Sequence, residues 1–241
     1  MTYNVHSCRG TDGVLSHERI AKVIEAFDPD VVALQELDVF RRRTGHLDQA
    51  TEIARLVSME SHFHPAIRVA DELYGDAILS KHPLKLVQAG ELPNPTRKWV
   101  DETRGALWVS VSVGGVEWQV INTHFGLGRG ERRLQAEALL GSDWLGAATG
   151  VGGPVCLCGD LNSPSGGTVH RMFRAKLRDV QLTSPTRTIR RTFSTSLPVL
   201  CLDYIFVNQR VGVLSTEVPR TPLTKVASDH FPLIANLEVA D

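Results

Sequence analysis

The sequence predicts an α/β fold in which two β-sheets pack face to face and helices cover their outer sides. Short apolar strands recur along the whole 241-residue chain, whereas helical periodicity is confined to a few segments. The clearest hairpin signal is Gly114-Gly115, which separates the alternating segments 106–113 and 116–121. This distribution suits two packed sheets better than a simple parallel doubly wound sheet.

The first part of the chain shows strand and helix signals in alternation. Residues 1–6 begin as a strand, and the compact apolar strand 31–34 stops at Gln35-Glu36. Between them Ser16 is typical of a helix N-cap, and Asp28-Pro29 is expected to end that helix. A second helix is expected to begin at Asp48.

Further along, residues 75–80 and 85–87 are interpreted as strands joined by the turn at His82-Pro83. The segments 131–144 and 169–177 have helical spacing. The remaining predicted strands are 154–158, which stops at Gly159-Asp160, and 202–207, 211–218 and 232–239.

Composition limits the class of protein. The net charge of −1 gives no global electrostatic reason to bind nucleic acid or an anionic membrane, so a polyanion would need a local patch. We find no run of eighteen apolar residues and no secretory leader, and we therefore expect one cytoplasmic domain over residues 1–241, without membrane insertion or an obligate protein partner. The cysteines lack the spacing of a disulfide scaffold or zinc site and are expected to be structural thiols: Cys8, Cys156, Cys158 and Cys201.

Polar residues of catalytic type recur at the ends of the predicted strands. Each alone has an ordinary explanation, since Asp and Asn often form turns and a single histidine is often structural. Strand ends on one side of a sheet converge in space, however, which makes a shared site the better explanation of the whole set. Its members are Asn4, Glu36, His124, Asp160, Asn162, Asp203, Asp229 and His230.

The donor types in this set indicate a narrow range of chemistry. Carboxylate and amide oxygens without cysteine favour Mg²⁺ or Mn²⁺ over zinc. Histidines beside carboxylates supply proton carriers or phosphate clamps, and Arg104 adds a guanidinium suited to phosphate oxygens. Together they indicate metal-assisted attack of water on a phosphate ester.

The motifs in which these residues occur resemble those of the endonuclease/exonuclease/phosphatase superfamily, which has the DNase I-like fold. They run in family order from residue 3 to residue 234, and the resemblance implies a four-layer α/β sandwich and a divalent-metal-dependent hydrolase of phosphodiesters or phosphomonoesters. The segments are Thr2-Tyr3-Asn4-Val5-His6, Gln35-Glu36, residues 74–80, Thr103-Arg104-Gly105, Asn122-Thr123-His124, residues 159–162, residues 202–205 and residues 228–232.

The resemblance also implies a role for each matching residue. Glu36 corresponds to the principal metal ligand, with Asn4 and Asp229 nearby. Asp160 corresponds to the residue that orients or deprotonates the attacking water, and Asn162 to one that positions the phosphate.

The other matching residues are expected to bind the phosphate and stabilise its negative charge. His230, held by Asp203, is expected to polarise or protonate at the phosphate, while His124 and Arg104 bind its non-bridging oxygens. Which group is the general base stays open.

The chain departs from the family patterns at three places. Asp76 stands where the family often has Asn, and it is expected to pair with His124, bind a second metal or point away. Leu202-Asp203-Tyr204 differs from the Cys-Asp-Arg element of inositol-polyphosphate phosphatases, and His124 replaces a tyrosine of abasic-site endonucleases. The chain looks closest to compact bacterial metal-dependent hydrolases of the superfamily.

Substrate identity is the least determined property. The basic residues between 163 and 202 form either a solvated surface or a substrate-phosphate patch, with Arg41-Arg42-Arg43 as a possible facing wall. Trp99 or Phe125 would stack on a base or cover a lipid head group, unless they belong to the core. Nucleic acid and phospholipid head groups both remain open, and the alternatives to a phosphodiesterase are a phosphomonoesterase and a non-catalytic phosphate-binding module.

Overall fold

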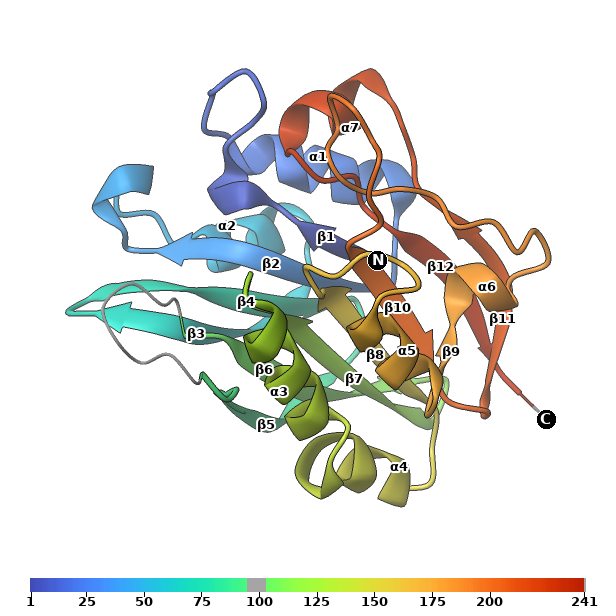
Figure 1. Ribbon diagram of the computed structural model, residues 1–241. Helices are drawn as coiled ribbons and strands as arrows, with labels where there is room; N and C mark the ends of the chain where they lie inside the picture. Colours follow the sequence, from blue (N-terminus) through green and yellow to red (C-terminus); the bar gives the residue numbers. More distant parts are fainter. Residues whose placement is uncertain (95–102, 241) are drawn as a thin grey trace.

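Two β-sheets form the centre of the structure, a computed structural model that describes residues 1–94 and 103–240 (Figure 1). The first sheet has four strands in the order β1-β2-β4-β3, and the second has six in the order β5-β6-β7-β8-β10-β9. A third, two-stranded sheet pairs β11 with β12, and reciprocal backbone hydrogen bonds between Thr2 and Leu233 attach its chain to β1. The α/β sandwich predicted from the strand pattern is confirmed.

The strands are mostly antiparallel, and β1–β2 and β7–β8 are the parallel pairs among those described. The first sheet contains β1 (Thr2–Asn4), β2 (Val31–Val39), β3 (Glu60–Val69) and β4 (Glu72–Ser80). The second contains β5 (Leu84–Glu91), β6 (Gly105–Val113), β7 (Val116–His124), β8 (Val155–Asp160), β9 (Arg178–Asp179) and β10 (Asp203–Val207). The small sheet is β11 (Val211–Glu217) with β12 (Ile234–Val239).

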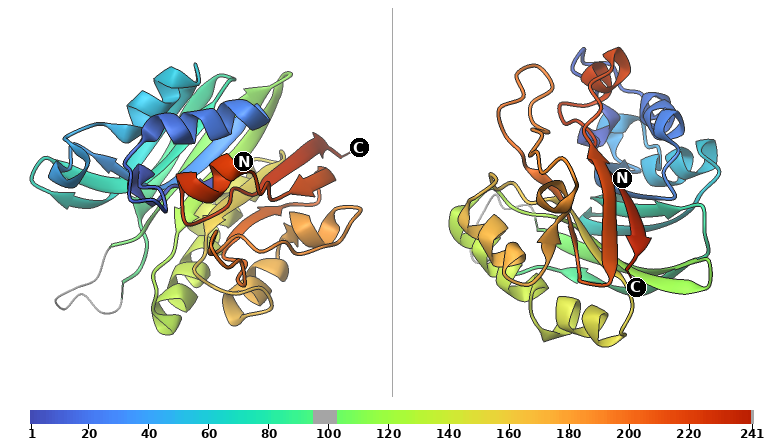
Figure 2. Two further views of the ribbon diagram at one scale, coloured as in Figure 1. Left: turned by 90° about the horizontal axis from the view of Figure 1, so that it is seen from above. Right: turned by 90° about the vertical axis from the view of Figure 1, so that its right-hand side faces the viewer.

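Helices cover both outer sides of the paired sheets, as the second view in Figure 2 shows. On one side lie α1 (His17–Phe27), α2 (Gln49–Leu56) and α7 (Pro222–Ala227). On the other lie α3 (Arg129–Leu139), α4 (Ala147–Gly150) and α5 (Thr168–Arg174), and the short α6 (Val180–Thr183) packs on β10. Single turns of other helix types occur at His6–Cys8, Arg42–Thr44 and Ser142–Gly146.

Three buried apolar clusters correspond to the spaces between these four layers. The middle cluster joins the sheets and includes Ile78 from β4 and Val109 from β6. One outer cluster lies under α1 and α2, and the other packs α3 and α5 on the second sheet. Burial of apolar surface in three contiguous layers is the main favourable term for such an arrangement.

Local sequence signals account for many element boundaries. Ser16 Oγ accepts a hydrogen bond from Arg19 N, and Asp48 caps α2 in the same way through Thr51 N. The hairpin about Gly114-Gly115 forms as predicted, and both glycines have positive φ.

The structure differs from the expected elements in several places. The strand expected to stop at Gln35-Glu36 continues to Val39 through a bulge, and β3 was not predicted. Strand β3 shows little strand pattern because Pro65 lies within it at an irregularity in its pairing with β4, as is common in edge strands. Strands β4 and β5 are connected through His82-Pro83 as predicted, and because they belong to different sheets this turn carries the chain between layers. The helix expected over 131–144 ends at Leu139, and a separate turn at Ser142–Gly146 follows Gly141.

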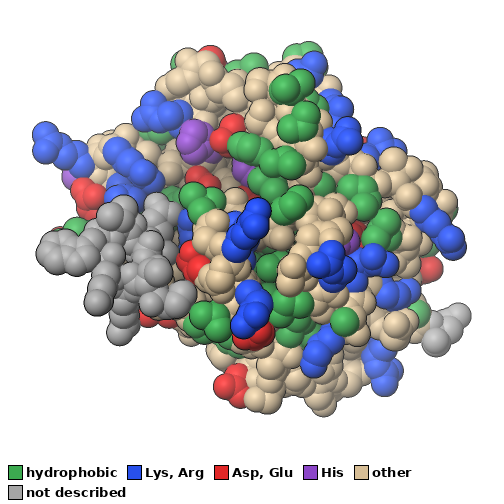
Figure 3. All heavy atoms as spheres, viewed as in Figure 1, with side chains coloured by type: hydrophobic (Ala, Val, Ile, Leu, Met, Phe, Trp, Pro, Cys, Tyr) green, Lys and Arg blue, Asp and Glu red, His purple; other side chains and the backbone are tan. Residues whose placement is uncertain are grey.

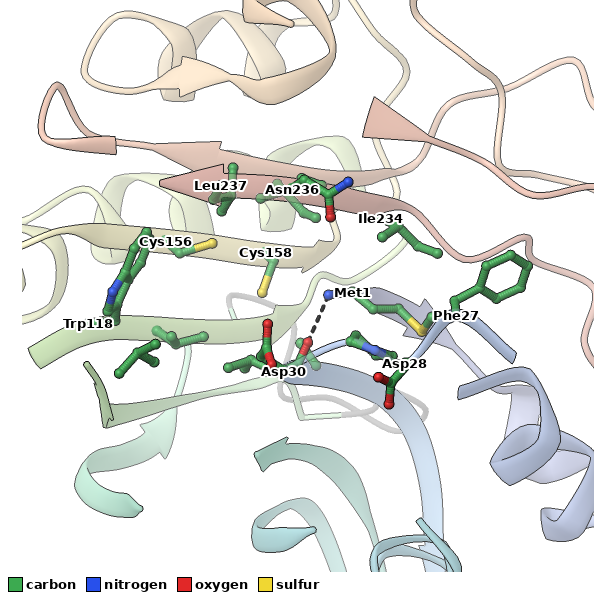
Figure 4. A pocket seen from close by; sticks show the side chains of 17 residues that line it. Met1, Phe27, Asp28, Asp30, Trp118, Cys156, Cys158, Ile234, Asn236 and Leu237 are labelled. Atoms are coloured by element: carbon green, nitrogen blue, oxygen red, sulfur yellow. Dashed lines mark hydrogen bonds between the residues drawn. The ribbon is translucent and has the colours of Figure 1, made fainter. Parts of the chain in front are cut away.

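A cavity of about 260 Å³ lies between the layers where β2 and β8 begin (Figure 4). Cys156 and Cys158 both face it, which confirms that they share one face of β8, and all four cysteines are free thiols. The Met1 amino group donates a hydrogen bond to Val31 O at 2.8 Å beside this cavity. Within residues 1–94 and 103–240, no helix has both the length and the apolar character needed to cross a membrane.

Gly159 provides a test of how tightly β7 and β8 approach. Its φ is +139°, and a Cβ placed there would lie 1.8 Å from Thr123 O. We therefore expect Gly159→Ala to lower the free energy of unfolding by at least about 2 kcal/mol, measured by denaturant titration. Gly130→Ala is the control, because a Cβ at this exposed position in α3 meets no atom within 4 Å, and it should be neutral or stabilising. Equal stability of the two variants would contradict this account.

Candidate active site

Three neighbouring strands of the second sheet bring the central polar residues together. The parallel pairing of β7 and β8 places His124 opposite Asp160, and the antiparallel pairing of β8 and β10 places Asp203 opposite Asp160. All three side chains are at least 97 % buried. This row of ionisable residues is a direct consequence of strand register.

The first sheet supplies Asn4 and Glu36. Asn4 ends β1, and its Nδ2 donates to Glu36 Oε1 at 2.9 Å and to Asp160 Oδ2 at 3.0 Å. Its Oδ1 accepts a hydrogen bond from His6 N. Glu36 lies in a bulge where the β2–β4 register shifts between Leu34 and Leu37, with a φ of +64°. Such bulges redirect a side chain, and here the glutamate lines the cavity.

His230 and Asp203 form the expected pair, with His230 Nδ1 2.9 Å from Asp203 Oδ2. His230 Nε2 lies 3.7 Å from Asp160 Oδ2. Burial acts to lower the pKa of His230, but the Asp203 and Asp160 carboxylates outweigh it and raise the pKa to about 10. The imidazole is therefore cationic at neutral pH.

The Asp160 carboxyl group has a raised pKa, so its neutral form is favoured relative to an ordinary aspartate. Burial and then the nearby Asp203 carboxylate raise its pKa, while His230, the Asn162 N–H and the Asn4 amide oppose that change. Asn162 N donates to Asp160 Oδ1 at 2.8 Å, so the residue that follows the strand also orients the carboxylate.

His124 is surrounded by N–H donors. Arg104 Nη1 donates to its Nδ1 at 3.0 Å, and Asn162 Nδ2 lies 3.0 Å from its Nε2 while donating to Phe125 O. Burial first, and then the Arg104 and His230 charges, lower the pKa of His124. A neutral imidazole accepts at only one nitrogen, so this corner has an excess of donors.

Asp76 lies beside Arg104, which was not among the expected arrangements of this residue. Burial raises the pKa of Asp76 to about 7, the Arg104 charge and a hydrogen bond from the Glu36 backbone oppose the increase, and the Glu36 and Asp160 carboxylates add to it. Its carboxyl group therefore belongs to the same electrostatic cluster as the predicted site residues.

A cavity of about 480 Å³ opens onto this cluster. In Figure 3, histidine and acidic side chains gather beside the loop that precedes β10. All nine predicted site residues line the cavity or bond directly to a residue that does: Asn4, Glu36, Arg104, His124, Asp160, Asn162, Asp203, Asp229 and His230.

Sequence reasoning missed part of the cavity wall. His6, Ser7 and Arg9 line it because His6–Cys8 forms a left-handed turn, with φ between 48° and 56°. The residues His6, Ser7 and Cys8 give no sequence signal for a left-handed turn, because none of them is glycine. The only available signal was that His6 lies two residues after the predicted site residue Asn4. Asp229 Oδ1 lies 3.9 Å from His6 Nδ1 at this edge.

The donor set fits a hard divalent cation. Ligand atoms of Asp160, Asp203 and His230 lie within 4.8 Å of one another, and Glu36 and Asp229 add carboxylates to the cavity. Within the described residues, the buried Asp203 Oδ1 has no hydrogen-bond partner. Asp203 and His230 already bond to each other. The Glu36 and Asp229 carboxylates, which line the cavity, are therefore better placed to coordinate a cation than Asp203 is.

The expected substrate walls are only partly formed. Arg43 lines the cavity, but Arg43 and Arg41 both pair with the buried Asp38, so much of the arginine run has a structural role. Phe125 is fully buried and packs near Phe173, so it cannot stack on a substrate. Trp99 lies outside the described residues.

Asp179 is the acid among the basic residues between 163 and 202, and it is buried away from the exposed arginines. Asp179 Oδ2 lies 2.8 Å from His170 Nε2 in a second buried pair. Arg178 donates to the Asn208 and Val211 carbonyls, whereas Arg187, Arg190 and Arg191 are exposed.

The sequence model of the Endonuclease/Exonuclease/phosphatase family matches residues 1–230, and the chain belongs to that family. This is a family of phosphoester hydrolases whose members typically use divalent metals. The chain is also 27 % identical to Escherichia coli (strain K12) protein YbhP over 170 residues, which are 69 % of this chain and 63 % of YbhP. The match therefore spans less than two thirds of that relative.

Solved structures with the same fold come from several branches. An endonuclease/exonuclease/phosphatase from Beutenbergia cavernae aligns with a TM-score of 0.81 at 23 % identity, over 99 % of this chain and 70 % of that one. A mannosyl-6-phosphatase of Bacteroides thetaiotaomicron has a TM-score of 0.78 at 20 % identity, over 98 % of both chains. The human Nocturnin catalytic domain with bound sulfate has a TM-score of 0.73 at 20 % identity, over 99 % and 92 % of the two chains.

The His230–Asp203 pair can be tested by titration. In metal-free protein, we expect Asp203→Asn to lower the pKa of His230 from about 10 toward its ordinary value, because the nearest anion is lost while burial remains. The measurement is the pH dependence of the His230 ring signals by NMR. Asp179→Asn is the matched control at the second His–Asp pair and should leave the His230 titration unchanged. An unaltered His230 pKa in Asp203→Asn would refute the assigned coupling.

Proposed function

We propose that this protein is a divalent-metal-dependent phosphoesterase that hydrolyses a phosphodiester by metal-assisted attack of water. The observation that carries the proposal is the Asn4 amide, which donates to both Glu36 and Asp160 and so joins the proposed metal side of the cavity to the proposed water side. Family membership supports the reaction class.

We assign the cation to Glu36, with Asn4 and Asp229 nearby, and Mg²⁺ or Mn²⁺ suits such oxygen donors. A bound divalent cation would supply Lewis acidity toward the phosphoryl oxygens. The Asn4 amide nitrogen faces the carboxylates and its Oδ1 faces His6 N, so its main contribution in this arrangement is to orient Glu36.

Asp160 is the proposed acceptor for the proton of the attacking water. The pKa of Asp160 is raised toward neutral pH, and a general base is most effective when its pKa lies near the working pH. Asn162 N and Asn4 Nδ2 hold its two oxygens, so the carboxylate keeps one orientation.

The phosphate is proposed to bind between the cationic His230 and the donor-rich corner at His124. Arginine only donates, so Arg104 makes Nδ1 of neutral His124 the acceptor and leaves the ring proton on Nε2. His124 Nε2 lies 3.7 Å from Asp160 Oδ2 and 3.0 Å from Asn162 Nδ2. A phosphate oxygen bound beside these groups would accept hydrogen bonds from both the His124 Nε2–H and the Asn162 amide. His230 would stabilise the negative charge that develops on the phosphoryl group.

A phosphomonoesterase is the second candidate. The similar mannosyl-6-phosphatase favours it, because a monoesterase can be built on this fold. Parallel assays of bis-p-nitrophenyl phosphate and p-nitrophenyl phosphate would separate the two activities.

Catalysis by Glu36 and His230 gives the main functional prediction. With Mg²⁺ or Mn²⁺ and bis-p-nitrophenyl phosphate, Glu36→Ala and His230→Ala should each reduce kcat/KM by about 10² or more, because charge stabilisation is lost. Glu52→Ala and His82→Ala, outside the cavity, are the controls and should retain wild-type turnover. Absence of metal-dependent turnover in the wild type, or full activity in both cavity variants, would count against the proposal.

The position of the cation can be determined by binding alone. Titration of Mn²⁺ by isothermal calorimetry should show a loss of affinity of at least about tenfold in Glu36→Gln, because one charged ligand is removed. Asp203→Asn should retain most of the affinity, since Asp203 is engaged with His230. The reverse order would place the cation at Asp160, Asp203 and His230.

A further inference from the structure

The loop between α6 and β10 forms a small hairpin beside the catalytic cavity, which we define as the tip hairpin, residues 192–200. Phe193 and Leu200 exchange backbone hydrogen bonds at 3.0 and 2.9 Å, and Thr192 N also donates to Leu200 O. The segment that these bonds enclose is Ser194–Val199. It is therefore an ordered turn with its own pairing.

Both the base and the turn of the tip hairpin are bonded to the segment that carries His230. Thr195 N donates to Asp229 O at 2.9 Å, Thr195 Oγ1 donates to Ser228 O, and Phe231 N donates to Thr192 O. The Phe193 ring lies 4.7 Å from the His230 imidazole. These contacts fix the orientation of the hairpin relative to the catalytic cavity.

The end of the hairpin presents aliphatic side chains to solvent. Leu197, Val199 and Leu200 are 68 %, 55 % and 39 % exposed. Figure 3 shows hydrophobic side chains gathered over this loop, next to the histidine and acidic side chains of the site. Exposed apolar groups collected on an ordered loop at a cavity mouth indicate an interaction surface.

Apolar surface also continues into the cavity. Phe193, Leu202 and Leu127 line it, and Leu127 is 74 % exposed at its edge. A substrate whose phosphoester reaches Asp160 would thus have apolar side chains along its path of entry.

Cationic side chains adjoin the base of the tip hairpin. Arg190 and Arg191 are exposed immediately before the hairpin, and Arg220 donates to Arg191 O at 3.3 Å. An aliphatic tip with exposed arginines at its base matches an anionic phospholipid surface, in which apolar side chains enter the acyl region and arginines contact phosphates. Single-stranded nucleic acid is a poorer match, because bases stack on aromatic rings and the exposed residues of the tip are aliphatic.

We propose that the tip hairpin docks on anionic phospholipid membranes and presents a lipid phosphoester to the cavity. This assignment of substrate class rests on the proposed phosphoesterase function, whereas docking itself is independent of turnover. The Leu197 and Val199 side chains would enter the lipid surface, and Arg190 and Arg191 would contact its phosphates.

Docking can be measured by co-sedimentation with phosphatidylcholine vesicles that contain phosphatidylglycerol. The wild type should bind, and Leu197→Ser combined with Val199→Ser should weaken binding by at least about tenfold, because apolar contact with the lipid is lost. Leu214→Ser is the matched control, since Leu214 is 51 % exposed on β11, and it should bind as the wild type does. Arg190→Glu with Arg191→Glu should reduce binding to these vesicles and make the remaining binding less sensitive to salt than that of the wild type.

Turnover separates this inference from the proposed function. The Leu197→Ser and Val199→Ser variant should keep wild-type activity on bis-p-nitrophenyl phosphate and lose activity on vesicle phosphatidylglycerol. The docking proposal would be overturned if the wild type did not bind the vesicles, or if the tip variant bound them as tightly as the wild type does. Either result would count even if diester turnover is normal. Vesicle binding that depends on the tip in a protein without metal-dependent turnover would support docking and refute the proposed function instead.

Discussion

The shared hydrogen bonds of Asn4 are the interaction on which the site depends most directly. One amide nitrogen on the first sheet donates to Glu36 from the same sheet and to Asp160 from the second. The two carboxylates are consequently held close together although β2 and β8 lie in different layers. Relative displacement of the sheets would break at least one of these bonds, so the packing of the sandwich and the geometry of the site are coupled.

Holding carboxylates close together inside a protein is costly unless positive charge or hydrogen bonds compensate. His230 and Arg104 supply cationic charge, and the N–H groups of Asn162 and Asn4 supply hydrogen bonds. Even so, the pKa values of Asp76 and Asp160 are raised, which means that the compensation is incomplete. A polar cluster with a surplus of anions is suited to a divalent cation, and such strain is common where function competes with stability.

Most of the site was predictable because it follows strand register. An apolar run followed by a polar residue identifies Glu36, His124 and Asp160, although β2 continues past Glu36 and a bulge redirects that side chain. Parallel and antiparallel pairing then bring His124 and Asp203 to Asp160. The wall at His6 was not predictable, since its left-handed turn arises from tertiary contacts, including the hydrogen bond from Gln49 Nε2 to Ser7 O. Likewise, the sequence could not show that Asp179, which lies within the basic segment, is buried against His170.

The tip hairpin illustrates a different limit. Leu197, Val199 and Leu200 have the composition of a core strand, and only the tertiary structure shows that hydrogen bonds to residues 228–231 hold them outward. Those same bonds hold the backbone on both sides of His230. One set of contacts thus orients both the His230 imidazole and the exposed apolar end, and it couples the proposed docking surface to the proposed phosphate-binding group. If the tip docks as proposed, a substrate that contacts it would approach His230 from a defined direction, because the same hydrogen bonds position both.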